Sequence, residues 1–403
     1  MTDIGAALAE AHRRDWAQVL ATTVRVTRDL DLAEECTQEA YAQALRTWPS
    51  SGIPDRPGAW LTQVARHRAL DVMRRDAALR RRLPLLVVDS PASSSGFSGG
   101  PLQLIFTCCH PALSRDAQVA LTARLVCGLS TAEIARAFLV PEPTMAARLT
   151  RAKKKIATAR IPYRIPAGDQ LAGRLGPVLD VIHLLFTTGH TAPAGPSLIR
   201  HDLVTGAIDL ARTLRLLMPR TAEVSALLAL LLITDARTPA RVGADGQLML
   251  LAEQDRTLWD RGRIAEGTAL LTDALRRRPP TRYAVEAAIA AVHAEAPAWA
   301  DTDWTEIVGL YDVLLRLCPG SPVIALNRAV ALGFRDGPEA GLAATEPLLS
   351  VPALAAYPYL SATRADFFRR LGRRAEAEAA YQEALALTSN EVERGFLSQQ
   401  AGT

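Results

Sequence analysis

Residues 128–156, GLSTAEIARAFLVPEPTMAARLTRAKKKI, decide how this chain is interpreted. Ser130 and Glu133 have the spacing of a capping box, so a helix is expected to begin there. Pro141 and Pro143 do not suit the middle of a helix, but they fit a turn and the first turn of a following helix. The stretch therefore predicts two short helices joined by a tight turn, which is typical of a helix-turn-helix that binds DNA.

The second of these helices is expected to bury one face and expose the other. Met145 and Leu149 lie four residues apart and predict its apolar stripe. The residues that then face outward or flank a DNA groove are Thr144, Ala147, Arg148, Arg151 and Lys154.

The composition of the rest of the chain predicts an all-α protein. The chain has 403 residues, enough for two or three domains, and 49% of them are hydrophobic. Runs of Ala, Leu, Arg and Glu are frequent, whereas strand-like alternation is rare. An apolar run of membrane-spanning length is absent, and the N-terminus lacks the apolar core of a signal peptide. We therefore expect a cytoplasmic protein with no membrane contact.

Charge is distributed unevenly along the chain. Residues 1–165 hold 23 Lys/Arg against 15 Asp/Glu, whereas residues 166–403 hold 23 against 27. Within the basic part, residues 56–82 contain eight arginines against Asp71 and Asp76. Such an imbalance favours phosphate binding over a merely solubilising surface.

Two helices are expected upstream of the helix-turn-helix at residues 128–156. Asp31 is expected to cap the first, with Glu34 three residues later. A loop from 49 to 57 is rich in Pro, Ser and Gly, and a second helix follows over 59–75. We assign residues 1–83 to a helical domain, 84–101 to a flexible linker, 102–165 to the helix-turn-helix domain and 166–403 to a helical C-terminal domain.

The C-terminal domain carries a weak internal repeat. Gly262, Leu271, Ala274 and Pro279 recur with the same offsets as Gly372, Tyr381, Ala384 and Ser389. The frame resembles a tetratricopeptide repeat, in which paired helices stack on their neighbours. A generic α-helical bundle is the alternative. Either scaffold offers a surface for a regulatory protein or ligand.

No catalytic or metal site is predicted. Five scattered cysteines fit a reducing compartment rather than a disulfide framework. Cys108, Cys109 and His110 lack the spacing of a zinc site, so we interpret the cysteines as small buried residues. Residues 96–100 match G-x-S-x-G without the strand and helix that a nucleophile elbow needs. We expect no enzyme, no cofactor and no metal.

The upstream segment resembles a known family. DLAEECTQEAYAQALRTW and then PDRPGAWLTQVARHRALDVMRR are similar to the first conserved domain of extracytoplasmic-function (group IV) sigma factors. The resemblance implies that the acidic helix binds the β′ clamp of core RNA polymerase through Asp31, Glu34, Glu35, Gln38 and Glu39. It implies that the basic helix binds the promoter −10 element through Arg66, His67, Arg68, Arg74 and Arg75.

The helix-turn-helix resembles the −35 domain of the same family. The matching residues are Glu133, Ile134, Ala135, Val140, Pro141, Thr144, Arg148, Leu149, Arg151 and Ala152. Two usual glycines are Leu139 and Pro143 here. The resemblance implies −35 contacts from Thr144, Arg148 and Arg151, and DNA-backbone contacts from Lys153, Lys154 and Lys155. It also makes the β flap of core polymerase an expected partner surface.

Residues 106–113, FTCCHPAL, together with the long helical extension, resemble one sigma subgroup. In that subgroup the extension is thought to control activity in place of a separate anti-sigma protein. The alternative is a conventional helix-turn-helix transcription regulator with a helical sensor domain, which binds operators alone, usually as a dimer. That alternative leaves the acidic helix at 31–48 without a role. We therefore expect an alternative sigma factor that binds core RNA polymerase and promoter DNA.

Overall fold

The computed structural model describes residues 4–81, 100–138, 140–166, 169–243, 246–277 and 279–402. The described residues form 18 α-helices, several short 3-10 helices and two strands of two residues each. The predicted all-α class is therefore confirmed. The chain divides into two compact units, Met1–Leu185 and Phe186–Thr403.

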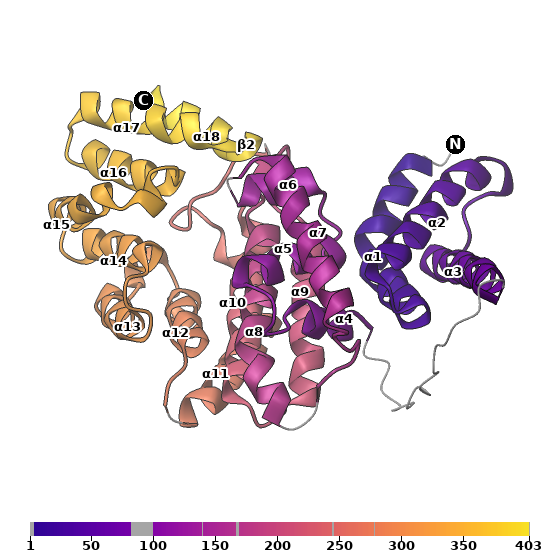
Figure 1. The fold of residues 1–403 in the computed structure, drawn as a ribbon. Helices are drawn as coiled ribbons and strands as arrows, with labels where there is room; N and C mark the ends of the chain where they lie inside the picture. Colours follow the sequence, from indigo (N-terminus) through magenta and orange to yellow (C-terminus); the bar gives the residue numbers. More distant parts are fainter. Residues whose placement is uncertain are drawn as a thin grey trace. The chain divides into compact units, whose positions relative to one another are not determined.

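The first unit begins with three helices and continues with a cluster of shorter ones (Figure 1). The three are α1 (Ile4–Thr27), α2 (Leu30–Ser51) and α3 (Pro57–Arg81). The cluster consists of α4 (Gly100–Cys108), α5 (Arg115–Leu125), α6 (Thr131–Ala137) and α7 (Glu142–Thr158). Helix α8 (Asp169–His190) begins in this unit and ends in the second.

Large aromatic residues hold α1, α2 and α3 together. Trp16 of α1 and Trp48 of α2 are buried, and the Trp48 ring meets the half-buried Trp60 of α3 edge-on at 5.7 Å. Leu20 of α1 and Leu61 of α3 are also fully buried. Burying side chains of this size supplies much of the free energy that holds three helices in one small domain.

The ends of these helices differ from the sequence expectation. Asp29, rather than Asp31, caps α2, because its side chain accepts hydrogen bonds from the backbone N–H groups of Asp31 and Leu32. Pro49 lies within the last turn of α2, and the helix ends at Ser51; its C-cap residue is Gly52, whose φ of +82° suits glycine. The expected loop is therefore shorter, running from Gly52 to Arg56.

The expected linker at 84–101 is only partly described. Residues 84–99 lie outside the described residues. Gly100 and Pro101 belong to α4, because that helix begins at Gly100.

The second unit is a succession of helices. Its α-helices after α8 are α9 (His201–Leu217), α10 (Ala222–Asp235), α11 (Arg261–Arg276), α12 (Arg282–Glu295), α13 (Trp304–Leu317), α14 (Pro322–Arg335), α15 (Pro338–Thr345), α16 (Pro358–Arg370), α17 (Arg374–Leu387) and α18 (Glu391–Ala401). Its 3-10 helices are Thr238–Ala240, Arg256–Leu258, Trp299–Asp301, Glu346–Ser350 and Pro352–Leu354, and its strands are β1 (Ala194–Gly195) and β2 (Ser389–Asn390).

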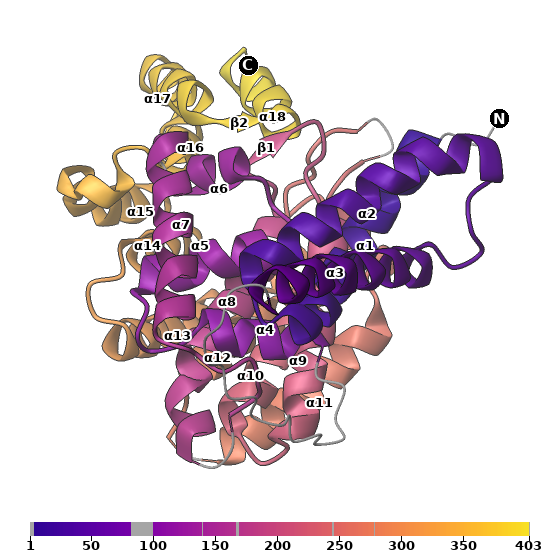
Figure 2. The same ribbon diagram turned by 45° about the vertical axis from the view of Figure 1, so that its right-hand side comes forward.

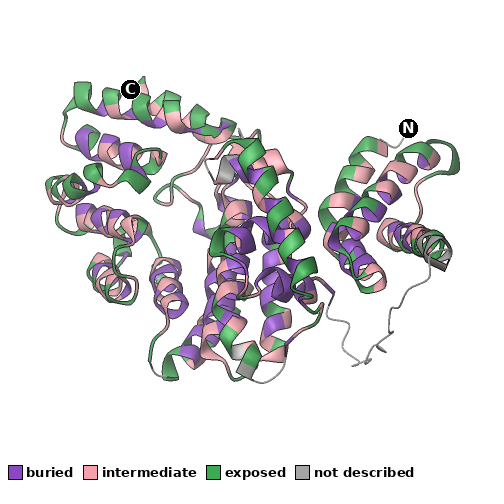
Figure 3. Ribbon diagram, viewed as in Figure 1, coloured by how far each residue is buried: buried purple, intermediate pink, exposed green. Residues whose placement is uncertain are grey.

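Helix α10 is central to this unit. Every residue from Val224 to Ile233 is buried, as expected for a helix that is apolar on all sides (Figure 3). It packs against α9, α11 and α12, and the later helices pack mainly on their neighbours in the chain.

A parallel pairing joins the two ends of the second unit. Ala194 of β1 pairs with Ser389 of β2, and Gly195 pairs with Asn390 (Figure 2). The fully buried Asn390 donates through Nδ2 to the carbonyls of Ala192 and Ser197, at 3.0 and 2.9 Å. Its Oδ1 accepts from the first turn of α18. One side chain therefore caps the last helix and fixes it beside the start of the unit.

Among the described residues, no helix has both the length and the apolar character needed to cross a lipid bilayer.

We predict that Gly341→Ala destabilises the second unit by about 1–3 kcal/mol, because overpacking a tight contact forces side chains or backbone to shift. A Cβ atom at Gly341 would lie 2.5 Å from Cζ of the buried Phe367 and 2.8 Å from Cα of Gly333. Thermal unfolding measures the change. Gly309→Ala in α13 is the matched control, since nothing lies within 4 Å of its Cβ position. An unchanged melting temperature for Gly341→Ala would show that this contact relaxes freely.

Candidate nucleic-acid and partner interface

The helix-turn-helix is formed by α6, a turn and α7. Ser130 and Glu133 make the expected capping box: the Glu133 carboxylate accepts from the Ser130 backbone at 2.7 Å, and Ser130 Oγ accepts from the Glu133 backbone at 3.2 Å. Pro141 is the N-cap residue of α7, and Pro143 lies in the first turn. Local sequence therefore sets both helix starts.

The buried stripe of α7 is also as expected. Met145 is fully buried and Leu149 nearly so, and the stripe continues through Ala152 and Ile156. The helix packs on α5 and α6 with this stripe. This packing leaves the opposite face of α7 in solvent.

The residues expected to contact the −35 element fall into two groups. Thr144, Arg151, Lys154 and Lys155 are exposed. Arg148 is half-buried: one guanidinium nitrogen lies 3.5 Å from the Asp116 carboxylate, and the group lies over the Phe138 ring at 5.7 Å. Helix α5 and the end of α6 therefore position the Arg148 side chain.

Lys153 has a different environment from its two neighbouring lysines. Its side chain is only 15% exposed, and Nζ donates to Glu34 Oε2 at 2.6 Å and to Asp31 Oδ1 at 2.9 Å. Burial disfavours the charge on Lys153, but the bonds to Glu34 and Asp31 outweigh that effect and raise its pKa above the usual value. Lys153 is therefore charged at neutral pH and occupied by two carboxylates.

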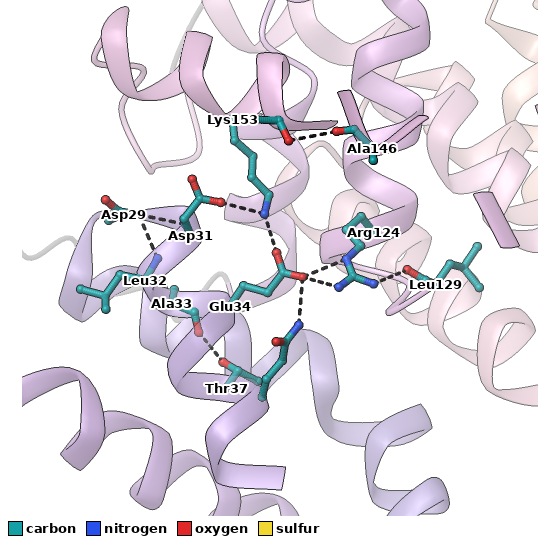
Figure 4. Close-up of polar contacts among 12 residues, drawn as sticks. Asp29, Asp31, Leu32, Ala33, Glu34, Thr37, Arg124, Leu129, Ala146 and Lys153 are labelled. Atoms are coloured by element: carbon teal, nitrogen blue, oxygen red, sulfur yellow. Dashed lines mark hydrogen bonds and ion pairs between the residues drawn. The ribbon is translucent and has the colours of Figure 1, made fainter. Parts of the chain in front are cut away.

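The carboxylate of Glu34 lies at the centre of this contact (Figure 4). The Glu34 side chain is 8% exposed, although we expected it on a polar face of its helix. Oε1 accepts from Arg124, with nitrogen–oxygen distances of 2.8 and 2.6 Å, and from Gln38 at 3.4 Å. Arg124 also donates to the carbonyl of Leu129 at 3.1 Å. Arg124 could not be identified as a functional residue from local sequence, because Glu34, which it binds, lies 90 positions away.

The other acidic and polar residues of α2 remain accessible. Glu35 and Gln38 are exposed, and the side chain of Asp31 is 74% exposed despite its bond to Lys153. Glu39 is half-buried and pairs with Arg46 on its own helix at 2.7 Å. Of the five residues expected to bind polymerase, Glu34 is the one whose side chain is buried.

The residues expected to contact the −10 element share one helix, α3. Those on its exposed surface are Arg66, His67, Arg74 and Arg75, and Arg68 is half-buried. Arg74 lies 3.6 Å from Asp71 on the same helix. The arrangement presents a basic surface suited to phosphates.

The adjacent cysteines are part of the core. Cys108 and Cys109 are both fully buried, and burial raises the pKa of the Cys109 thiol to about 12. Neutral buried thiols behave as small apolar groups. Among the described residues, no group of three His, Cys, Asp or Glu side chains is arranged to hold a metal ion.

Three segments of this chain match known protein families. The sigma-70 region 2 family matches residues 8–79, the sigma-70 region 4 family matches residues 103–156, and a family of unknown function (DUF6596) matches residues 174–275. An uncharacterised protein of Rhizobium meliloti (strain 1021) is 42% identical over 393 residues, which cover 95% of this chain and 92% of that protein. This chain belongs to the same family.

A second relative matches a much smaller part of this chain. The ECF RNA polymerase sigma factor SigK of Mycobacterium sp. (strain KMS) is 36% identical over 80 residues, which cover 19% of this chain and 40% of SigK. Region 2 corresponds to α1–α3 and region 4 to α4–α7. Together these domains indicate a sigma-70-type transcription initiation factor, and they imply binding to core RNA polymerase and promoter DNA.

We predict that Ser130→Ala speeds amide hydrogen exchange in α6 about five-fold, because losing a helix cap costs about 1 kcal/mol. Hydrogen–deuterium exchange of the full chain, read at residues 131–137, measures the effect. Ser114→Ala is the control: Ser114 is the N-cap residue of α5, but its side chain makes no capping hydrogen bond. Equal exchange in both variants would mean that the capping box does not stabilise α6.

Proposed function

We propose that this protein is an alternative sigma factor that binds core RNA polymerase and directs promoter-specific initiation. The observation that supports this most is the pairing of sigma-70 regions 2 and 4 in one chain. Two short DNA elements read together give selectivity through effective concentration, although each contact alone is modest. The protein has no catalytic role of its own in this proposal, since polymerase performs the chemistry.

Region 2, within residues 1–83, would bind both polymerase and the −10 element. The acidic surface of α2 suits a basic partner, and we assign to it the β′ clamp of core polymerase. The residues are Asp31, Glu34, Glu35, Gln38 and Glu39. Basic residues on α3 suit a single strand and the duplex upstream of it. They are Arg66, His67, Arg68, Arg74 and Arg75.

Region 4, within residues 102–165, would bind the −35 element and the β flap. The exposed Thr144 and Arg151, together with Arg148, are assigned to base or phosphate contacts in the major groove. Lys153, Lys154 and Lys155 are assigned to the DNA backbone, where contacts position the helix without carrying sequence information.

The helical domain at 166–403 would control this activity. Its net charge of −4 is opposite to that of the preceding segment. Its helices pack mainly on neighbours in the chain, which suits tetratricopeptide-like repeats and a partner-binding surface. We assign to it a regulatory protein or ligand as partner, and a cytoplasmic location to the whole chain.

Run-off transcription with core polymerase on fragmented genomic DNA tests the function. Transcripts from defined starts that share −10 and −35 motifs are expected. DNA binding without initiation would instead favour the conventional regulator. A fragment of residues 1–165, once circular dichroism has shown that it is folded, tests the role of residues 166–403. If the fragment is more active in transcription than the full chain, residues 166–403 inhibit. If it is less active, they activate.

We predict that Glu35→Lys weakens binding to core polymerase about ten-fold, because it places a positive charge on an acidic surface that meets a basic partner. Glu35 is chosen because it is exposed. Binding is measured by fluorescence anisotropy of labelled protein. The control is Glu383→Lys, the same change at an exposed position of α17. Equal affinities of the two variants would contradict the assignment of α2 to polymerase.

We predict that Arg151→Ala lowers transcription from a native promoter about ten-fold or more, since a base contact contributes about 1–3 kcal/mol. The loss should shrink on a promoter whose −35 element has been mutated. Arg276→Ala, at an exposed arginine of α11, should leave both promoters unaffected. If Arg151→Ala reduces transcription from both promoters equally, Arg151 does not contact the −35 element.

A further inference from the structure

The second unit contains an apolar pocket that has no part in the contacts assigned to polymerase and DNA. Its volume is about 730 Å³, which is within the range of cavities that hold small molecules. Its walls include residues of α12, α13, α14, α16 and α18, together with residues 250–253. Elements that are far apart in the sequence therefore enclose one cavity.

Aromatic rings form one wall of this pocket. Trp304 and Phe334 stack at a centroid distance of 4.6 Å, and Trp299 meets each of them edge-on at 5.0 Å. Such a wall favours an aromatic ligand, because rings pack well against the faces and edges of other rings. The guanidinium of Arg370 already lies over the Phe334 ring at 4.8 Å, which is the kind of position that a cationic ligand would take.

Three arginines near the pocket lack a carboxylate partner. They are Arg237, Arg241 and Arg256, called the arginine cluster below, and none of them forms an ion pair within the described part of the chain. Arg241 and Arg256 donate to uncharged oxygens. The half-buried Arg237 makes no side-chain hydrogen bond with any described residue. Because an unpaired charge away from water is unfavourable, Arg237 is suited to an anion from outside the chain.

The positive charge of the arginine cluster acts on the pocket wall. Burial, together with the cations of Arg237 and Arg256, lowers the pKa of the wall residue His293 to about 3. Burial raises the pKa of Tyr311, also in the wall, to about 12, and Arg237 opposes that rise. Burial and the other two arginines lower the pKa of Arg237 to about 10, so it stays charged at neutral pH. A fixed positive charge therefore lies beside the apolar wall.

The carboxylates that line the pocket need no cation from a ligand. Glu393 accepts from the Tyr359 hydroxyl at 2.7 Å, and Asp366 accepts from Arg369 at 2.6 Å. Glu253 is exposed to solvent. The charge that the protein leaves unmatched near this pocket is therefore positive, which favours a negatively charged ligand.

We propose that this pocket binds a small aromatic organic anion, with its ring against Trp299, Trp304 and Phe334 and its negative charge toward Arg237. The volume, the aromatic wall and the unmatched arginine cluster all suit one ligand of this kind. The proposal specifies the partner of the helical domain at 166–403. Any consequence for transcription rests on the proposed function, whereas the site itself rests on the geometry of the second unit.

Two fluorescent probes test the site in the full chain, without polymerase or DNA. Anilinonaphthalenesulfonate is an aromatic anion, and N-phenylnaphthylamine has the same rings without the charge. The anionic probe should bind at one molecule per chain and about ten-fold more tightly than the neutral probe, because a charge-assisted contact adds to the same ring contacts. Equal affinities for the two probes would refute an anion site.

Arg237→Met tests the charge, because methionine is long and apolar. The variant should bind the anionic probe about ten-fold more weakly and the neutral probe as the wild type does. Its melting temperature should stay the same or rise, since an unpaired charge has been removed. Arg276→Met, at an exposed position of α11, is the control and should change neither affinity. An unchanged affinity of Arg237→Met for the anionic probe would overturn the proposal.

Two further variants cover poor folding of Arg237→Met and binding elsewhere on the chain. Arg241→Gln removes a charge from the same cluster but keeps a donor for the His190 carbonyl, and it should weaken only the anionic probe. Asn327→Trp adds a large side chain at an exposed position of the pocket wall and should weaken both probes. If Asn327→Trp changes neither affinity, the probes bind outside the pocket and the proposal is wrong. A chain that fails in run-off transcription but binds the probes as expected would refute the proposed function alone.

Discussion

The first unit is organised around one buried negative charge, the carboxylate of Glu34. It lies in the second turn of α2. The protein supplies the compensating charges from two other helices, α5 and α7, through Arg124 and Lys153. Packing between regions 2 and 4 therefore depends on pairing the charge of Glu34 as well as on burying apolar side chains. Removing either cation leaves the buried carboxylate with one positive charge in place of two.

What the sequence could reveal depended on how far apart the interacting residues are. The helix-turn-helix was predictable because its determinants are local: Ser130 and Glu133 cap α6, and Met145 and Leu149 share one face of α7. The burial of Glu34 was not predictable, because Lys153 lies 119 positions away from it. The start of α2 was misplaced for another reason. Two aspartates stand near it, and backbone geometry selects Asp29.

The repeat in the second unit shows a related limit. Gly262 and Gly372 occupy equivalent positions in the sequence frame. Gly262 lies in the first turn of α11, whereas Gly372 lies in the turn before α17 with φ of +73°. The same spacing therefore serves two different backbone roles. Periodicity indicated stacked helices, but it did not specify how each turn is built.

The pairing of β1 with β2 affects how the second unit unfolds. In an open array of helical repeats, each repeat touches only its neighbours, so the ends fray and stability adds up unit by unit. Here the last helix is tied to the first strand through Asn390. An opening at either end then costs contacts at both ends. The unit is therefore expected to unfold as one cooperative block, because β2 links its C-terminal helices directly to the residues that follow α8.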